Sequence, residues 1–360
     1  MIRVAYRMAA AVAVLFAAWS CGARSELTAP VVESDGGAGG EGGAVPCMTG
    51  IVTLEKAHPA VMFVIDRSRS MQDKLGKGDG QGSRWSLLID ALASTLPAVD
   101  QSMEIGALFY PAGSGGGGDL SCVVPAIPEL MPATGNVAPL IGAMNALPPS
   151  GGTPTADALA TAAGALSVIH AATTARALVL ATDGGPNCNE ALDPDECTCA
   201  ASGNGCKQSK MCLDDARTVD RIAAFYEKGL PTYVIGIQEE GDIQFTSVLD
   251  AMADAGGRPK AGSEQHYYAA RSGAELTAAL AAIRDQVGSC TFLTTSVPND
   301  GGTIVMRMGG VEIPYDPMGV DGWTWGNRDN GEVVLTGTAC ANAAADANAT
   351  LEAEVQCASP

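Results

Sequence analysis

Residues 61–71 read Val-Met-Phe-Val-Ile-Asp-Arg-Ser-Arg-Ser-Met. The five apolar residues that open this stretch are typical of a β-strand buried on both faces. Asp66, Ser68 and Ser70 then place three oxygen-bearing side chains on alternate residues, where the strand is expected to end. In an open α/β sheet, ligands bind outside the carboxyl ends of the strands. One carboxylate and two hydroxyls at this position indicate a site for a hard divalent cation such as Mg²⁺.

The composition favours an exported binding protein over a nucleic-acid-binding protein or an enzyme. The 360 residues exceed one typical domain, and 47% of them are hydrophobic, which is ample for a core. A formal net charge of −19 disfavours nucleic acid, whose phosphates are bound by lysine and arginine. The three histidines, His58, His170 and His266, belong to no zinc-protease or nucleophile motif. A hydrolase that uses the cation as a Lewis acid is therefore the least favoured hypothesis.

The first residues predict export. Residues 1–20 combine two arginines with an apolar run of signal-peptide length. Residues 18–22, Ala-Trp-Ser-Cys-Gly, resemble a bacterial lipobox, which predicts that Cys21 is lipidated; cleavage near Ala23 without lipidation is the alternative. Residues 21–46 are then a glycine-rich linker. We expect a protein of the outer membrane, the cell surface or the periplasm that contacts the membrane only through its lipid anchor.

Strand and helix patterns alternate along the central part of the chain. Strands are expected at residues 61–65, 105–110, 176–182, 231–237 and 265–269. Helices are expected at residues 85–99, 156–172, 214–229, 243–255 and 274–287. This alternation predicts an α/β fold of the Rossmann-like, doubly wound kind, with helices on both faces of a mainly parallel sheet. After Cys290 short strands and turns take over, including a hairpin at 303–313, so residues 291–360 are expected to form a small β module.

Two later segments repeat the arrangement of the opening stretch. Residues 151–155, Gly-Gly-Thr-Pro-Thr, place Thr153 in a turn before a helix. Residues 182–184, Thr-Asp-Gly, place Asp183 at the end of another buried strand. With residues 66–70, these segments resemble the metal-ion-dependent adhesion site of von Willebrand factor type A domains, and they occur in that family's order.

The resemblance covers residues 47–290, including a cysteine-rich insertion at 186–213. More narrowly, the chain resembles secreted and cell-surface lipoproteins of myxobacteria, with which it shares Arg84-Trp85 and the run Thr-Asp-Gly-Gly-Pro-Asn at 182–187. The resemblance implies a fold with a divalent cation, most readily Mg²⁺, with Mn²⁺ or Ca²⁺ as alternatives. The implied metal-binding residues are Asp66, Ser68, Ser70, Thr153 and Asp183.

In this family the hydroxyls bind the metal directly and the aspartates act largely through water, which leaves the cation seeking an external carboxylate. We therefore expect an adhesion-like protein that binds a protein or another acidic ligand through the metal. Arg69 replaces a frequent glycine of the family, and Arg67 and Arg69 are expected either to face outward toward acidic ligands or to be solvated loop residues. One alternative is a structural envelope lipoprotein in which the metal only stabilises the fold. Another is that Asp66, Ser68 and Thr153 only cap turns and helix starts.

Ten cysteines remain when Cys21 is set aside, and an even number in an exported chain indicates disulfides. Five lie in the insertion at 186–213, so one of these is expected to pair outside it, with Cys122. Zinc is disfavoured because the insertion has no Cys-x-x-Cys and no histidine. The predicted bridges are Cys47–Cys290, Cys340–Cys357, and three of open pairing among Cys122, Cys188, Cys197, Cys199, Cys206 and Cys212.

Overall fold

The structure is a computed structural model of the 360-residue chain. The described ranges are 44–75, 82–113, 121–168, 175–200, 206–239, 244–260, 262–346 and 349–358. The expected signal peptide, the lipidation site at Cys21, most of the linker and His170 lie outside these ranges. Within them, no helix has the length and apolar character required to cross a bilayer.

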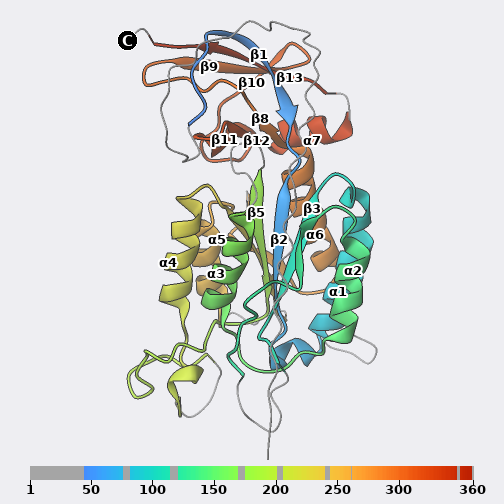
Figure 1. Cartoon of the computed structure of the whole chain (residues 1–360), viewed down its shortest axis with the longest axis vertical. Helices are drawn as coiled ribbons and strands as arrows, with labels where there is room; N and C mark the ends of the chain where they lie inside the picture. Colours follow the sequence, from blue (N-terminus) through green and yellow to red (C-terminus); the bar gives the residue numbers. More distant parts are fainter. Residues whose placement is uncertain are drawn as a thin grey trace, which may run out of the picture. The chain divides into compact units, whose positions relative to one another are not determined.

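A six-stranded sheet forms the centre of the α/β part (Figure 1), with the strand order β4-β3-β2-β5-β6-β7. Its strands are β2 (Ala60–Asp66), β3 (Glu104–Tyr110), β4 (Leu130–Ala133), β5 (Arg176–Thr182), β6 (Thr232–Ile237) and β7 (Tyr268–Ala270). All neighbouring pairs are parallel except β3 and β4. The register places Asp66 opposite Tyr110, and Ile65 opposite Ala181, so the carboxyl ends of the central strands meet at one edge.

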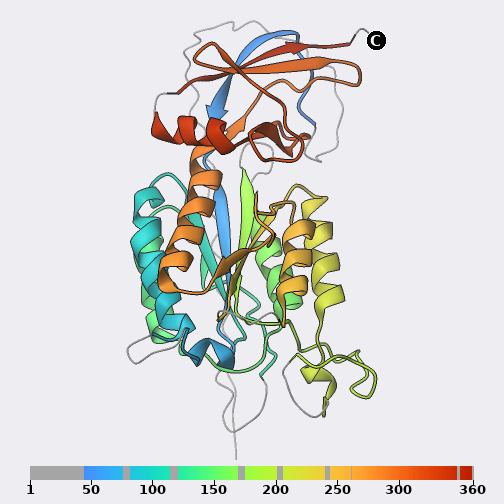
Figure 2. The same ribbon diagram turned by 180° about the vertical axis from the view of Figure 1, so that it is seen from behind.

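Helices cover both faces of this sheet. One face carries α1 (Arg84–Thr95), α2 (Val137–Ala146) and α6 (Gly273–Ser289), and Figure 2 shows α6 beside α1. The other face carries α3 (Thr155–Leu166), α4 (Asp215–Tyr226) and α5 (Thr246–Ala255). Side chains of β2 alternate between the two cores, which explains its continuous apolar run. The prediction of a mixed α/β chain is confirmed.

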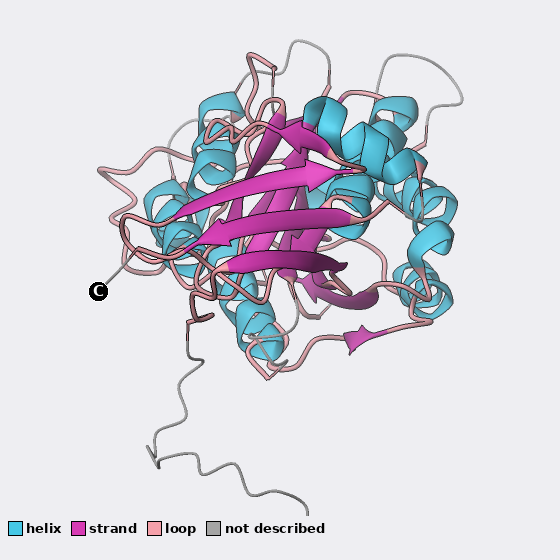
Figure 3. Ribbon diagram, turned by 90° about the horizontal axis from the view of Figure 1, so that it is seen from above, coloured by secondary structure: helices cyan, strands magenta, loops and turns pink. Residues whose placement is uncertain are grey.

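A seven-stranded antiparallel sheet forms the second part, with the order β10-β9-β13-β1-β8-β12-β11 (Figure 3). Its elements are β1 (Gly50–Lys56), β8 (Thr291–Leu293), β9 (Thr303–Met308), β10 (Val311–Ile313), β11 (Gly322–Asn327), β12 (Glu332–Thr336), α7 (Gly337–Ala345) and β13 (Leu351–Gln356). The sequence assigned residues 47–56 to the α/β domain, whereas β1 pairs with β13 and β8 of this sheet. The hairpin predicted at 303–313 is present as β9 and β10.

Because β1 belongs to this sheet, two predicted disulfides are wrong. The register that sets Gly50 opposite Val355 brings Cys47 next to Cys357, and these two are bonded. Cys290, at the start of β8, is bonded instead to Cys340 of α7. The other three bridges are Cys122–Cys188, Cys197–Cys212 and Cys199–Cys206, which confirms that the insertion pairs with Cys122.

A buried ion pair joins the two sheets. Arg258, which follows α5, lies 3.3 Å from the Oε1 atom of Glu332 at the start of β12, and both side chains are almost fully buried. Burial raises the pKa of Glu332, and the charge of Arg258 opposes that rise. Arg258 also lies over the ring of Tyr233, with 5.9 Å between the guanidinium carbon and the ring centre.

Candidate metal centre

Three loops meet where β2 and β5 end. Ser68 and Ser70 follow β2, the second of them within a short 3₁₀ helix, Arg69–Gln72. Thr153 precedes α3, and Asp183 follows β5. These four residues line one cavity of about 510 Å³. Asp66 is the fifth residue of the predicted set. It is fully buried, and its carboxylate accepts a hydrogen bond from the Ser68 main-chain N–H.

Asp66 has no positively charged partner among the contacts that hold it. One carboxylate oxygen accepts a hydrogen bond from the Ser68 main-chain N–H at 2.7 Å, and the other accepts one from the Thr182 hydroxyl at 2.7 Å. Burial, and then the negative charge of Asp183, raise the pKa of Asp66 to about 7, although both hydrogen bonds oppose the rise. The carboxylate is therefore held where a neighbouring positive charge is strongly favoured.

The two serine hydroxyls connect the aspartates. The Oγ atoms of Ser68 and Ser70 lie 3.1 Å apart, and Ser70 donates a hydrogen bond to Oδ1 of Asp183 at 2.9 Å. Side-chain oxygen atoms of three loop residues are thus in direct contact at the edge of the sheet. Hydroxyl and carboxylate oxygens are the donors that Mg²⁺ and Ca²⁺ prefer.

The Thr153 loop is fixed to the loop that follows β5. The Thr153 N–H donates to the side-chain oxygen of Asn187 at 2.8 Å, and the Asn187 N–H donates to the Thr153 carbonyl at 2.9 Å. A side chain at Gly152 would meet Asn187 at 3.0 Å and the sulfur of Cys188 at 2.8 Å, so only glycine fits there. The Cys122–Cys188 disulfide therefore lies directly behind the Thr153 loop and helps to fix its position.

Arg84 is a member of the site for which the sequence predicted no role. It is the first residue of α1, its side chain is about nine-tenths buried, and its Nη1 donates to Oδ2 of Asp183 at 2.7 Å. Burial raises the pKa of Asp183, and Arg84 opposes that rise. One signal was available in the sequence: a basic residue is disfavoured at a helix N-terminus, so Arg84 at the start of an amphipathic pattern called for a carboxylate partner.

The two arginines of the opening stretch have different environments. Arg67 does not face outward, because it is buried and donates to three main-chain carbonyls, those of Pro111 at 2.8 Å, Gly113 at 2.7 Å and Pro148 at 2.5 Å. Arg69 is exposed and lines the cavity, which fits both the outward orientation and the solvated-loop alternative. Arg67 therefore ties three loops together, and Arg69 is available to a ligand.

The residues present fit a hard divalent cation. The metal-binding set combines two buried carboxylates with three hydroxyls, and only one of the carboxylates has an arginine counter-charge. Among the described residues, the cavity lining contains no histidine and no free thiol. The sulfurs of Cys197 and Cys206 lie 3.3 Å apart in the insertion, but both belong to disulfides, which disfavours zinc there.

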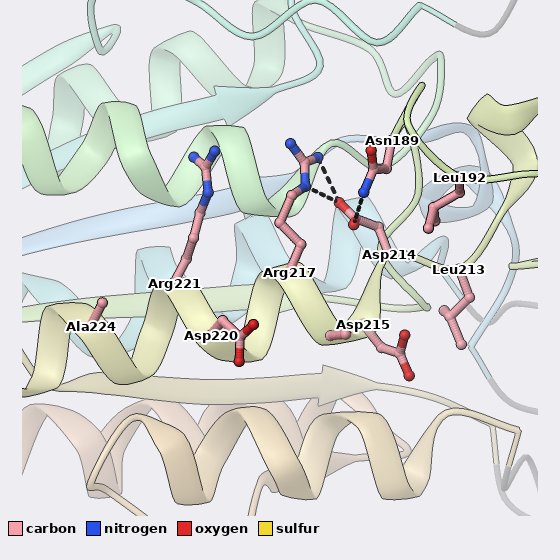
Figure 4. Close-up of a pocket in the computed structure, with 10 residues that line it drawn as sticks. Asn189, Leu192, Leu213, Asp214, Asp215, Arg217, Asp220, Arg221 and Ala224 are labelled. Atoms are coloured by element: carbon pink, nitrogen blue, oxygen red, sulfur yellow. Dashed lines mark hydrogen bonds and ion pairs between the residues drawn. The ribbon is translucent and has the colours of Figure 1, made fainter.

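A second cavity, of about 410 Å³, lies beside the start of α4 (Figure 4). Three of its charged residues, Asp214, Arg217 and Arg221, are paired. Asp214 accepts a hydrogen bond from Asn189 at 2.7 Å and forms an ion pair with Arg217. Arg217 and Arg221 also pair with Asp157 on α3. These contacts attach the cysteine-rich insertion and α3 to α4, and we assign the cluster a structural role.

No family model and no curated protein matches the chain. Among solved structures, it is similar to the PilB minor pilin from Streptococcus sanguinis, at 18% identity and a TM-score of 0.44 over 65% of this chain and 62% of the pilin. It is similar to the pilus adhesin SpaC from Lactobacillus rhamnosus GG in its open conformation, at 12% identity and a TM-score of 0.46 over 84% of this chain and 39% of the adhesin. A third similar structure is the vWF domain of the type V pili tip protein Mfa5 from Porphyromonas gingivalis, at 16% identity and a TM-score of 0.42 over 64% of this chain and 94% of that domain. The match thus spans less than two thirds of the PilB and SpaC chains.

Proposed function

We propose that this protein is an adhesion-like binding protein of the cell envelope, and that it engages a carboxylate of its partner through a divalent cation. The observation that carries the proposal is the meeting of three loops at one cavity. There, Ser68, Ser70, Thr153 and Asp183 surround a space next to the buried Asp66, with which no arginine among the described residues forms an ion pair.

The proposal assigns a role to each residue of the set. The hydroxyls of Ser68, Ser70 and Thr153 would hold the cation, and Asp66 and Asp183 would supply negative charge close to it. When bound, the cation offers a positive centre on which an aspartate or glutamate side chain, or another acidic group, can bind. Because hydroxyls are uncharged, the site neutralises the cation only in part. The proposal includes no catalytic step and no nucleic-acid partner.

Isothermal titration of the soluble domain with Mg²⁺, Mn²⁺ and Ca²⁺ tests metal binding directly. We expect the wild-type protein to bind and Asp66→Ala to lose most of the affinity. Asp316→Ala is a control away from the site, because Asp316 is a half-buried aspartate of the loop between β10 and β11 whose carboxylate accepts three main-chain hydrogen bonds. If wild-type protein and Asp66→Ala give the same titration, the adhesion-site hypothesis fails.

The family and the location are part of the same proposal. The strand order and the three motif segments support a von Willebrand factor type A domain carrying the cysteine-rich insertion, with Mg²⁺ as its first-choice ion. Five disulfides support an oxidising compartment outside the cytoplasm. Lipidation of Cys21 would anchor the protein to the bacterial outer membrane, and Cys21→Ser should move it from the membrane to the soluble envelope fraction.

A structural envelope lipoprotein, in which the metal only stabilises the fold, is the second candidate. Pull-down from an envelope extract, with and without EDTA, separates the two functions. Adhesion-like binding predicts a captured partner that EDTA releases, and that Thr153→Ala captures poorly. The structural function predicts that Mg²⁺ raises the melting temperature but that partner capture is the same in EDTA.

A further inference from the structure

Arg84 is placed where an arginine needs a specific reason to be. It opens α1, where the helix dipole is already positive, and its side chain is about nine-tenths buried. Its Nη1 contacts Oδ2 of Asp183 at 2.7 Å and the Ser70 carbonyl at 3.4 Å. Its Nε has no hydrogen-bond partner among the described residues. The guanidinium thus contacts two residues of the metal-binding set, Asp183 closely and Ser70 at longer range, and is not bound on all sides.

The arginine also lines the cavity that the cation would occupy. The two buried aspartates contribute two negative charges there, and Arg84 cancels one of them; the exposed Asp73 and Arg69, which also line the cavity, carry opposite charges. A divalent cation added to this set leaves one net positive charge at the centre. Without Arg84, the same cation would be neutralised completely. Because unit charges a few ångströms apart interact strongly in a partly buried site, this difference changes affinity measurably.

We infer that Arg84 is a specificity-determining residue of the metal centre: it weakens the binding of the cation and strengthens the binding of an acidic partner to the loaded site. The inference rests on the proposed function and goes beyond it, because it explains why the centre favours a carboxylate over a neutral oxygen ligand. Arg84 acts through Asp183 and through its charge. It is therefore a positioning residue rather than a metal ligand.

A purely structural role makes a different prediction. If Arg84 only attached α1 to the loop after β5, its replacement would loosen this attachment. Cation binding and carboxylate binding would then weaken together. The inferred role instead moves the two affinities in opposite directions. This opposition is the signature to measure.

Arg84→Gln is the informative variant, because glutamine removes the charge and keeps an uncharged amide donor on a shorter side chain. Arg84→Lys keeps the charge, and Arg69→Gln removes a charge from the same cavity without contact to Asp183. For each protein, the Mg²⁺ affinity is measured by calorimetry. Acetate is then titrated into Mn²⁺-loaded protein, and its binding is followed by the loss of water-proton relaxation as it displaces metal-bound water.

We expect Arg84→Gln to bind Mg²⁺ about tenfold more tightly and acetate about tenfold more weakly than the wild type. Arg84→Lys should stay close to the wild type in both titrations, and Arg69→Gln should change each affinity less. Equal Mg²⁺ affinity in the wild type and Arg84→Gln, or a loss of both affinities, overturns the inference alone. If the wild type binds no cation, the proposed function fails, and this inference fails with it.

Discussion

Replacing Asp66 with asparagine should stabilise the protein when no metal is present, although the carboxylate that it replaces is buried and hydrogen-bonded. The ordinary pKa of this carboxyl is 3.8, and burial next to Asp183 raises it to about 7 in the folded chain. Between these two values the folded protein binds more protons than the unfolded chain. The free energy of unfolding therefore falls as the pH rises through this window. Below pH 4 the side chain is neutral in both states and costs nothing.

The magnitude follows from the shift. A rise of about three pKa units corresponds to about 4 kcal/mol of stability that the metal-free protein loses above pH 7. Asparagine is neutral at every pH and avoids this loss. It also fits the site: its carbonyl can accept from the Ser68 N–H, and its amide can donate to the Thr182 hydroxyl, whose own proton can turn to the Gly184 carbonyl 3.4 Å away. We expect a gain that approaches 4 kcal/mol at pH 8 and vanishes near pH 4.

Urea unfolding in EDTA at pH 4 to 8 measures this gain. Asp183→Asn is the matched control, because the same substitution there leaves Arg84 buried without its partner and should destabilise the protein by about 3–5 kcal/mol. With saturating Mg²⁺ the wild type should instead be more stable than Asp66→Asn, since only a protein that binds the metal is stabilised by it. The reasoning is refuted if Asp66→Asn is no more stable than the wild type at pH 8 in EDTA, or if its effect is the same at pH 4 and pH 8.

Three further predictions concern the metal, the loops and the contact between the sheets. Protons should compete with Mg²⁺ at Asp66, so the dissociation constant measured by calorimetry should be about twofold higher at pH 7 and about tenfold higher at pH 6 than at pH 8. A flat profile would contradict this competition. Arg67→Ala removes one buried and two partly buried hydrogen bonds and should cost about 3–5 kcal/mol in urea unfolding and weaken Mg²⁺ binding, whereas Arg69→Ala should change stability by less than about 0.5 kcal/mol. Glu332→Ala leaves Arg258 buried and unpaired, and should lower the free energy of unfolding by about 3–5 kcal/mol; a loss below about 1 kcal/mol would show that the pair contributes little.

The parallel strands were predictable because their signal is local. A strand covered by helices on both faces must be apolar along its whole length, as β2 and β5 are, and this pattern needs no knowledge of distant residues. Elements with weaker local signals were not predicted. β1 has one fully buried residue, Leu54, and β4 contains Pro132, which is tolerated because β4 is an edge strand. α2 contains Pro139 and Gly142, both poor helix formers.

Two disulfides were predicted wrongly because one strand, β1, was not recognised in the sequence. Because residues 50–56 were assigned to the α/β domain, Cys47 was expected to close that domain with Cys290. The observed pairing depends on the register of β1 against β13, which lies about 300 residues away along the chain and leaves no local trace. The prediction for Cys122 succeeded because it used the odd number of cysteines in the insertion and the position of Cys122 in a loop that follows the carboxyl end of a strand.

The candidate site was likewise predictable only in part. The positions of Asp66, Thr153 and Asp183 followed from strand ends and turns, which are local features. The partners of Arg67 and Arg84 did not, because they depend on the paths of loops and on how α1 packs beside the sheet. The sequence can show only that a charged residue lies at a position expected to be buried. This indicates that the residue has a partner but does not identify the partner.

The division of charge at this site connects its stability to its function. Asp183 has a counter-charge in Arg84, which opposes the rise in its pKa that burial causes. Asp66 has none, so it must hold a proton or a cation, and in the metal-free protein its ionisation costs stability. A site with two compensated carboxylates would have no need of the metal, and a site with none would neutralise the cation fully and leave little attraction for a partner. With one compensated and one uncompensated carboxylate, the metal-free state is destabilised by a single buried charge. The metal-loaded state then retains a positive charge to which an acidic partner can bind.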